Sequence, residues 1–302
     1  MKNIKANDTI ALSYLFTNKV LNNIIHKDFT KLMKIFSEFN INNIFNQNIT
    51  FKELFENSYK QLLKHYKNEY VFKNAIAQKI LLGRHSIKSS VLFTEFRVET
   101  SKADIVIFNG TSHVYEIKTE LDTLERLQKQ IKDYQKVFEY VNIVTVESKV
   151  KAIKEMIDDR VGIIVLTDRY TLKTIKKTKS GLDMIDKNSV FNLFRKQEYL
   201  KVIKDYQGSI PDVPNTKIHS VSQEIFNQFS IKEVNKILVK TLKQRKNYND
   251  LVTNIKKFPN SLKLAILELG LNQKEQKDFL ELLDTKINSI PIQRATNVLS
   301  IS

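Results

Sequence analysis

The sequence predicts a mixed α/β protein, in which a sheet is flanked by helices and further helices extend both ends. Between residues 68 and 167 the hydrophobic pattern gives a helix, three strands, a second helix and more strands. Before residue 67 and after residue 220, apolar residues recur at the three- and four-residue spacing of amphipathic helices. The stretch 161–167, VGIIVLT, is apolar enough to be a strand buried on both faces.

The elements follow one another in a clear order. The predicted helix at 68–83 ends at Gly83. Alternating residues then predict a strand from residue 91, followed by strands at 103–108 and 113–118. Asn109-Gly110 joins these two as a tight turn, because both residues tolerate positive φ. A helix capped by Asp122 is expected to run to about Tyr140. A strand at 142–148, a short helix at 150–157 and the strand at 161–167 complete the series.

Four regions are predicted along the chain. Residues 1–67 form an N-terminal helical region, and residues 68–206 form a core with a basic helical flank. The segment 207–218 is a linker, since two prolines, a glycine and small polar residues interrupt every periodic pattern there. Residues 219–302 form a C-terminal helical domain with Gly270 as a helix stop. This last domain could bind nucleic acid, a partner chain or a second copy of itself.

Composition limits the classes of protein. The chain has 302 residues, 42% of them hydrophobic, which allows one large domain or two to three small ones. The net charge of +16 fits either a polyanionic partner or a lysine-rich solvated surface. The absence of cysteine excludes disulfides and thiolate metal sites. No apolar run is long enough for a membrane span, so a soluble, cytoplasmic protein without a membrane partner is expected.

Three polar residues on the predicted hairpin carry chemistry. Glu116 and Lys118 point to one face of their strand, because side chains alternate with period two. If Asp104 on the neighbouring strand lies beside them, two carboxylates and an ammonium converge. Hard Mg²⁺ prefers such oxygen ligands, and the backbone carbonyl of Ile117 would be a third. The Lys118 ammonium could hold the attacking water or offset phosphate charge.

These residues, with Gln130-x-x-x-Tyr134 on the following helix, resemble the signature of the PD-(D/E)XK nuclease superfamily. The QxxxY motif is similar to that of its RecB-like branch, and residues 69–167 resemble a small bacterial and phage family within it. The resemblance implies a restriction-endonuclease-like core of order αβββαβ. It also implies Mg²⁺- or Mn²⁺-dependent hydrolysis of DNA, with RNA left open as a substrate, in phage–host conflict or DNA repair. The iron–sulfur cluster of some relatives is excluded, because its cysteines are missing.

The resemblance also suggests roles for further residues. Glu69 on the first helix, or Glu95 on the first strand, could complete a second metal site. Gln130 and Tyr134 would help to position DNA or the metal-bound water, and Arg126, on the same helical face, suits a phosphate contact. Arg97, Lys176 and Lys177 are further candidates for holding the nucleic acid strand. Residues 169–207, where Lys176 and Lys177 lie, could equally be an amphipathic helix with a solvated basic side.

A second hypothesis keeps the same scaffold without turnover: a non-catalytic nucleic-acid-binding or assembly module. Its basic charge and helical flanks would look the same. Retention of Asp104, Glu116 and Lys118 together favours catalysis, since an inactive copy need not keep all three.

Overall fold

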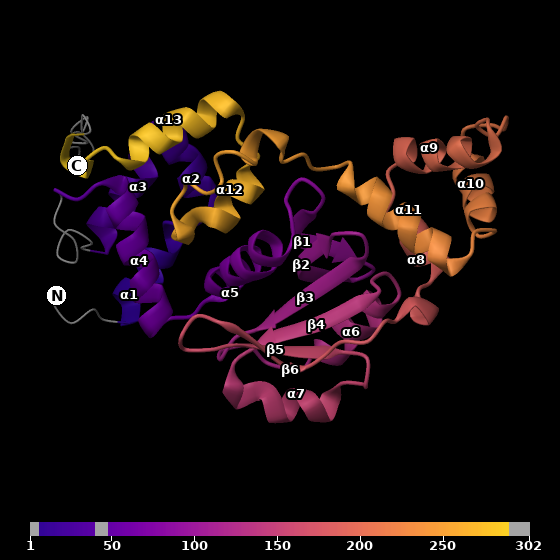
Figure 1. Cartoon of the computed structure of the whole chain (residues 1–302), viewed down its shortest axis with the longest axis horizontal. Coiled ribbons are helices and arrows are strands. Elements are labelled where there is room, and N and C mark those ends of the chain that lie inside the picture. The colour runs from indigo at the N-terminus through magenta and orange to yellow at the C-terminus, as the bar shows by residue number, and fades with distance from the viewer. Residues whose placement is uncertain (1–5, 40–47, 290–302) are drawn as a thin grey trace, which may run out of the picture. The chain divides into compact units, whose positions relative to one another are not determined.

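The computed structural model describes residues 6–39 and 48–289 and shows a mixed α/β protein with one six-stranded sheet flanked by helices (Figure 1). The chain divides into two compact units. One contains residues 1–70 and 253–302, and the other contains residues 71–252. The predicted C-terminal helical domain, 219–302, is therefore shared between the two units.

The first unit is helical within its described residues. Its N-terminal helices pack against helices from the far end of the chain, since α2 contacts α12 and α4 contacts α13. Thr50 and Glu53 form a capping box that fixes the start of α4. Gly270 ends α12 in the left-handed conformation with a φ of 61°, as the sequence predicts. The elements are α1 Ala6–Tyr14, α2 Asn18–Ile25, α3 Thr30–Glu38, α4 Phe51–His65, α12 Lys263–Leu269 and α13 Gln273–Leu283.

The second unit is built on the sheet, whose strands follow chain order from β1 to β6. β1, β2 and β3 are antiparallel, β3, β4 and β5 are parallel, and β6 returns antiparallel to β5. The parallel strands are almost entirely buried, which explains their apolar sequences. The strands are β1 Val91–Val98, β2 Ser101–Phe108, β3 Ser112–Lys118, β4 Tyr140–Thr145, β5 Gly162–Leu166 and β6 Leu172–Lys176.

Helices on either side of these strands position the site. α5 Glu69–Ile76 continues as a π-helix, η2 Ala77–Leu82, which contacts β1. This helix ends at Gly83 as predicted, but with a φ of −88°. A side chain at Gly83 would meet the carbonyl oxygen of Gln78 at 3.1 Å, so close approach explains the glycine. α6 Leu127–Gln135 packs on β2 and β4.

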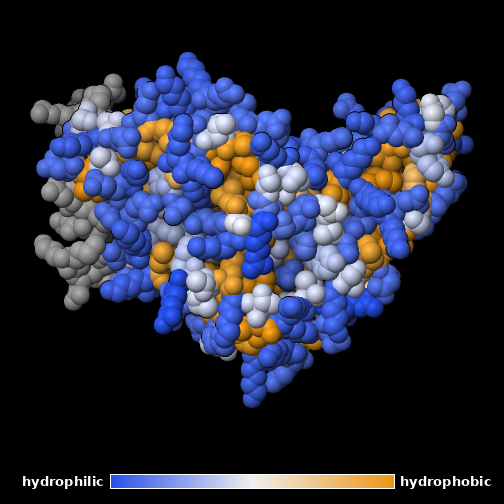
Figure 2. All heavy atoms as spheres, viewed as in Figure 1, coloured by the Kyte–Doolittle hydropathy of each residue, from blue (hydrophilic) through white to orange (hydrophobic). Residues whose placement is uncertain are grey.

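The remainder of the second unit is helical and basic. α7 Val150–Met156 links β4 to β5. The other helices are α8 Lys187–Phe191, α9 Lys196–Gln207, α10 Ile218–Phe226 and α11 Ile231–Lys243. Hydrophilic side chains cover most of the face shown in Figure 2, and hydrophobic ones reach the surface in several places, among them around α9, α10 and α11.

Three predictions about local structure are wrong. Asp122 does not cap a helix: its carboxylate accepts hydrogen bonds from the amide and hydroxyl of Thr119, and α6 begins only at Leu127. The turn after β2 uses positive φ at Gly110 alone, not also at Asn109, because three residues rather than two separate the paired Phe108 and Ser112. The strand β6 lies within the segment predicted to be a basic flank. Its alternating pattern is too polar to stand out, because β6 lies at the edge of the sheet.

Candidate functional site

Asp104, Glu116 and Glu95 occupy one row across three neighbouring strands. The ladder between β2 and β3 pairs Ile105 with Tyr115, and the next step in this register sets Asp104 opposite Glu116. The ladder between β1 and β2 has pairs on both sides of the position where Glu95 faces Asp104. Residues directly opposite each other in antiparallel strands are close neighbours. The hairpin therefore brings the predicted carboxylates into line.

The carboxylate of Glu116 is the centre of a hydrogen-bonded cluster, which we call the Glu116 centre: Glu116, Lys118, Gln130 and Tyr134. One oxygen of Glu116 lies 2.7 Å from Lys118 Nζ and 2.5 Å from Gln130 Nε2. Its other oxygen accepts a hydrogen bond of 2.7 Å from the Tyr134 hydroxyl. Lys118 Nζ also donates to Gln130 Oε1 at 2.9 Å. All four residues were predicted to act together, and the structure brings them into mutual contact.

Most of the Glu116 centre is buried. Glu116 is 1% exposed, Lys118 8% and Tyr134 0%, so the ion pair is almost fully removed from water. A buried ion pair persists only when further hydrogen bonds satisfy its remaining polar atoms, which is the role that Gln130 and Tyr134 fill here. Burial, aided by the negative charge of Glu116, raises the pKa of Tyr134 far above its ordinary range. Tyr134 therefore remains a hydrogen-bond donor.

Helix α6 delivers Gln130 and Tyr134 because they are four residues apart, and such residues share one face of a helix. Leu127 and Ile131 on the same helix are buried. The ring of Phe138, just beyond the helix, contacts Phe108 of β2 with ring centres 6.3 Å apart. This packing fixes the distance of the helix from the sheet. Arg126 precedes the first helical residue and is exposed.

Asp104 uses one carboxylate oxygen to accept a hydrogen bond of 2.6 Å from the backbone amide of Ile117. This bond ties β2 to β3 directly between Glu116 and Lys118. Ile117 itself is buried, as predicted from the alternation of β3. The proposed use of its carbonyl oxygen as a metal ligand stays a prediction.

Asp104 also belongs to an acidic cluster formed by Glu69, Glu95 and Asp104. Each offers one carboxylate oxygen, and these oxygens all lie within 4.8 Å of one another. The boundary between the two compact units falls within helix α5. Glu69 is nevertheless held by the same continuous helix as Val71–Ile76, which belongs to the sheet unit. Both Glu69 and Glu95, the two alternatives of the sequence, therefore reach Asp104.

Two lysines hold Glu95. Lys73 of α5 and Lys102 of β2 each form an ion pair with one of its carboxylate oxygens. Partial burial pulls the pKa of Glu95 upward, but the hydrogen bonds and charges of Lys102 and Lys73 outweigh it and hold the pKa below 4.5. The carboxylate is ionised at neutral pH and is already neutralised by ammonium groups.

The backbone at Glu95 is strained. Its φ of 53° is left-handed, which costs a non-glycine residue about 1 kcal/mol or more. In a regular strand Phe93 and Phe96 would point to opposite faces. Here their ring centres are 5.6 Å apart, and Phe96 also contacts Phe138. The irregular backbone thus places the half-buried Phe96 against Phe138, just beyond α6, while Glu95 faces Lys73 of α5.

The donor set suits a hard divalent cation. Three carboxylates supply oxygen ligands of the kind that Mg²⁺ and Mn²⁺ prefer. A metal at this position would compete with the ammonium groups of Lys73 and Lys102 for Glu95. Glu116, expected from the sequence to share the ion with Asp104, instead uses both oxygens for Lys118, Gln130 and Tyr134.

The predicted nucleic-acid-binding residues are dispersed. Arg97 is exposed on β1, opposite Lys102 in the register. Lys176, the last residue of β6, donates to the backbone carbonyl of Asp158 at 2.6 Å, and Lys177 is exposed. Neither lysine belongs to the Glu116 centre or to the acidic cluster. Their role in binding stays a prediction.

Sequence reasoning missed Lys73 and Lys102. Neither stands in a recognisable motif, and both meet Glu95 only through pairing of β1 with β2 and packing of α5. One signal for Lys102 was available in the sequence. Lys102 lies two residues before Asp104 on one strand, so the two side chains point to the same face of the sheet.

This arrangement defines a mixed α/β protein with a buried Glu–Lys pair and an acidic cluster along one row of its sheet. The model of the family "Bacteriophage P4 protein cII" matches residues 62–266, more than half of the chain. The protein belongs to this phage P4 cII family. The match includes every predicted site residue.

Protein cII of Enterobacteria phage P4 is 22% identical over 181 residues, which cover 58% of this chain and 66% of that protein. The matched region thus spans just under two thirds of the relative. A protein of unknown function from Silicibacter pomeroyi is 11% identical and covers 45% of this chain and 88% of its own, with a TM-score of 0.30. That score is too low to bear on the fold. In the described ranges, each helix is too short or too polar to cross a membrane.

Proposed function

We propose that the protein is a nuclease of the PD-(D/E)XK type, which hydrolyses DNA phosphodiester bonds with Mg²⁺ or Mn²⁺. The observation that carries this proposal is the Glu116 centre. The sequence offered five residues for one chemistry, and they lie on two strands and a helix. Four of them are hydrogen-bonded together: Glu116, Lys118, Gln130 and Tyr134. The fifth, Asp104, is joined to the same strand through the amide of Ile117. A chance arrangement of surface charges would not bury such a group.

The proposed restriction-endonuclease-like core is the part of the sheet unit from α5 to β4. It has a helix, three antiparallel strands, a helix and a strand parallel to β3. This order is what the resemblance implies. A role in phage–host conflict is supported by membership of a family named for a bacteriophage protein.

Glu69, Glu95 and Asp104 would hold the metal ion, which supplies a Lewis acid that lowers the pKa of bound water and offsets phosphate charge. The chain contributes position and electrostatics. The Lys118 ammonium lies beside Glu116, which the strand register sets opposite Asp104, and there it would orient water or a phosphate oxygen. Glu116, Gln130 and Tyr134 hold that ammonium in place, so they are positioning residues in this scheme.

The test is DNA cleavage by matched variants. Plasmid and single-stranded DNA are incubated with the full-length protein and Mn²⁺, with and without EDTA. We expect cleavage that EDTA abolishes and that Asp104→Asn reduces by roughly 100-fold or more, since loss of one group stabilising the transition state has this magnitude. Asp159→Asn, at a side chain that is 80% exposed, is the control and should cleave normally.

Cleavage by Asp104→Asn at the wild-type rate would refute this site. Complete inactivity of the wild-type protein on both substrates, with metal bound, would refute the nuclease.

A second function is favoured by one observation: the ammonium groups of Lys73 and Lys102 already occupy Glu95. A non-catalytic nucleic-acid-binding module would use the same sheet with these ion pairs kept in place. In that case the protein would bind DNA equally well with Mn²⁺ and with EDTA, and would not cleave it.

A further inference from the structure

Helix α11 carries a row of lysines that none of the preceding chemistry uses. The α11 lysine ridge consists of Lys232, Lys236, Lys240 and Lys243, spaced by four, four and three residues. Residues at these spacings lie along one face of a helix, about 5–6 Å apart. The first three are exposed and Lys243 is half-buried.

The opposite side of α11 fixes the direction of the ridge. Val234, Leu238 and Leu242 are fully buried. Asn235 donates to the carboxylate of Glu139 at 2.9 Å and accepts a hydrogen bond of 3.0 Å from the hydroxyl of Ser112 at the start of β3. The helix therefore cannot rotate without breaking a buried polar network, so the lysines are held outward.

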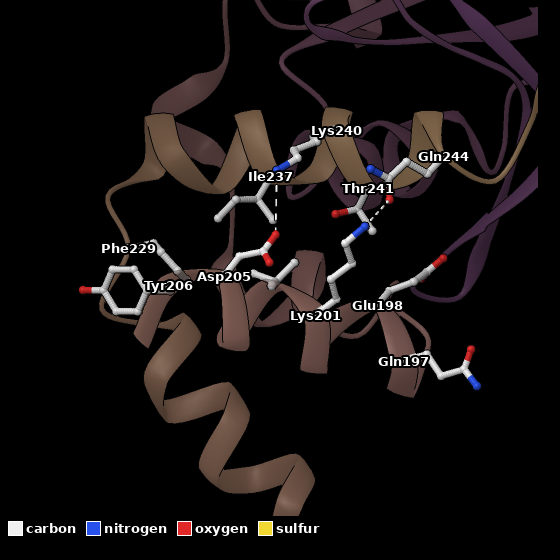
Figure 3. Close-up of a pocket in the computed structure, with 11 residues that line it drawn as sticks. Gln197, Glu198, Lys201, Asp205, Tyr206, Phe229, Ile237, Lys240, Thr241 and Gln244 are labelled. Carbon is white, nitrogen blue, oxygen red and sulfur yellow. Dashed lines mark hydrogen bonds and ion pairs between the residues drawn. The ribbon is translucent and has the colours of Figure 1, made fainter. Parts of the chain in front are cut away.

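The positive charge of the ridge is only partly compensated. Glu233, the one acidic residue of α11, caps its own helix through Ser230, and this bond lowers the pKa of Glu233. Lys240 lies 3.8 Å from Asp205 of α9, with both side chains more than half exposed (Figure 3). In the part of the chain that is described, Lys236 and Lys243 form no ion pair. Like charges four residues apart destabilise a helix slightly, so the stability of α11 does not explain the row of lysines.

The ridge lines an open hollow on the surface. A hollow of about 400 Å³ is bounded by Gly110, Lys236, Val239, Lys240, Lys243 and Gln244. Gly110 forms the turn between β2 and β3 with a φ of 111°, and no atom lies within 4 Å of where a Cβ would be. The hollow thus has a small-residue turn on one side and three ammonium groups on the other. Such a surface fits a backbone of repeated negative charge rather than a single carboxylate.

We propose that the α11 lysine ridge binds the phosphate backbone of DNA. Regular spacing of like charges along a helix matches successive phosphates of one strand, and each neutralised phosphate releases counterions. The net charge of +16 supports a polyanionic partner. This inference deepens the proposed nuclease function, because it assigns the surface that holds the substrate away from the cleaved bond.

The position of the ridge limits the length of DNA that it can engage. Gly110 is six residues beyond Asp104, but only the four up to Phe108 belong to β2, so the separation is at least roughly 13 Å and at most roughly 20 Å at about 3.3 Å per residue. Since DNA rises about 3.4 Å per base pair, a duplex would extend about four to six base pairs from the cleaved bond to reach the ridge. A DNA duplex with a shorter end should not contact the ridge.

The experiment measures binding without cleavage. Affinity of the full-length protein for a fluorescein-labelled DNA duplex is measured in EDTA between about 50 and 200 mM salt. The test variant is Lys236→Gln/Lys240→Gln. The matched control is Lys151→Gln/Lys154→Gln, which removes two exposed lysines from α7.

We expect the slope of log affinity against log salt to become shallower by about 2 in the test variant, since each phosphate contact contributes about 0.9. The control should keep the wild-type slope. The proposal would be overturned if the test and control variants had the same slope, whether that slope equals the wild-type value or is shallower by the same amount in both.

The outcome separates this inference from the proposed function. If the protein binds DNA through the ridge but never cleaves it, the inference about the ridge stands and the proposed nuclease function is refuted. If the protein cleaves DNA but the test variant shows the wild-type salt dependence of binding, the nuclease function stands and the inference about the ridge is refuted.

Discussion

Two carboxylates on the same row of the sheet, Glu116 and Glu95, are held in opposite ways. Glu116 is buried and receives hydrogen bonds from Lys118, Gln130 and Tyr134. The side chain of Glu95 is 41% exposed, sits on a left-handed backbone and pairs with two lysines from different elements. The partners of Glu116 are buried or half-buried, whereas Glu95 pairs with one buried lysine, Lys73, and one exposed lysine, Lys102, whose place water can take.

This difference indicates separate tasks. Interactions in a buried site are strong and fix geometry, but any change to one partner is expensive. The ion pair of Glu95 with the exposed Lys102 contributes little, so an entering cation can displace it more easily than the pair with the buried Lys73. We therefore interpret Glu116 as the residue that positions Lys118, and Glu95 with Asp104 and Glu69 as the exchangeable ligand set.

The largest expected effect breaks the buried side of the comparison. Glu116→Gln leaves the Lys118 ammonium buried without its counter-charge, which should lower the free energy of unfolding by about 3–5 kcal/mol. Urea denaturation at neutral pH measures it. Adding Lys118→Met removes the second charge and should restore much of the loss, because replacing both members of a buried pair by uncharged groups is often neutral. If Glu116→Gln lowers the free energy of unfolding only slightly, or if adding Lys118→Met restores none of it, the Glu116–Lys118 pair is not desolvated.

A smaller effect is expected at the exposed side, where Lys102→Gln removes one competitor for Glu95. Its side chain is 56% exposed. Affinity for Mn²⁺ should rise about two- to fivefold, because an exposed ion pair contributes about 0.2–1 kcal/mol. Calorimetric titration of the full-length protein measures this, with Lys132→Gln at an exposed position of α6 as control. Weaker Mn²⁺ binding in Lys102→Gln would contradict a metal role for Glu95.

The smallest effect concerns pH. The folded-state pKa of Glu95 lies below its ordinary value of 4.5, so its stabilising contribution is present above that value and is lost as the pH falls through the folded pKa. The stability difference between wild type and Glu95→Gln should be constant above pH 4.5 and shrink below it. Urea midpoints across acidic pH measure the difference. A stability difference that stays the same below pH 4.5 would contradict the role of Lys73 and Lys102 in holding the Glu95 carboxylate.

Periodicity alone predicted much of the Glu116 centre. Alternation along β3 put Glu116 and Lys118 on one face with Ile117 buried, and four-residue spacing aligned Gln130 with Tyr134. These relations are local, since they depend only on the repeat of a strand or helix. Local repeats also predicted the hairpin, the order of the main strands and the end of α12 at Gly270.

Relations between distant segments required the tertiary structure. The sequence left Glu69 and Glu95 as alternatives, whereas pairing of β1 with β2 and the packing of α5 bring both to Asp104. It did not predict that Lys73 and Lys102 hold Glu95, or that α11 turns three lysines toward the Gly110 turn. The sequence by itself determined which polar residues share a face. Only the folded chain decided which faces meet, because that choice depends on the register of strands and the burial of apolar surface between elements far apart in the sequence.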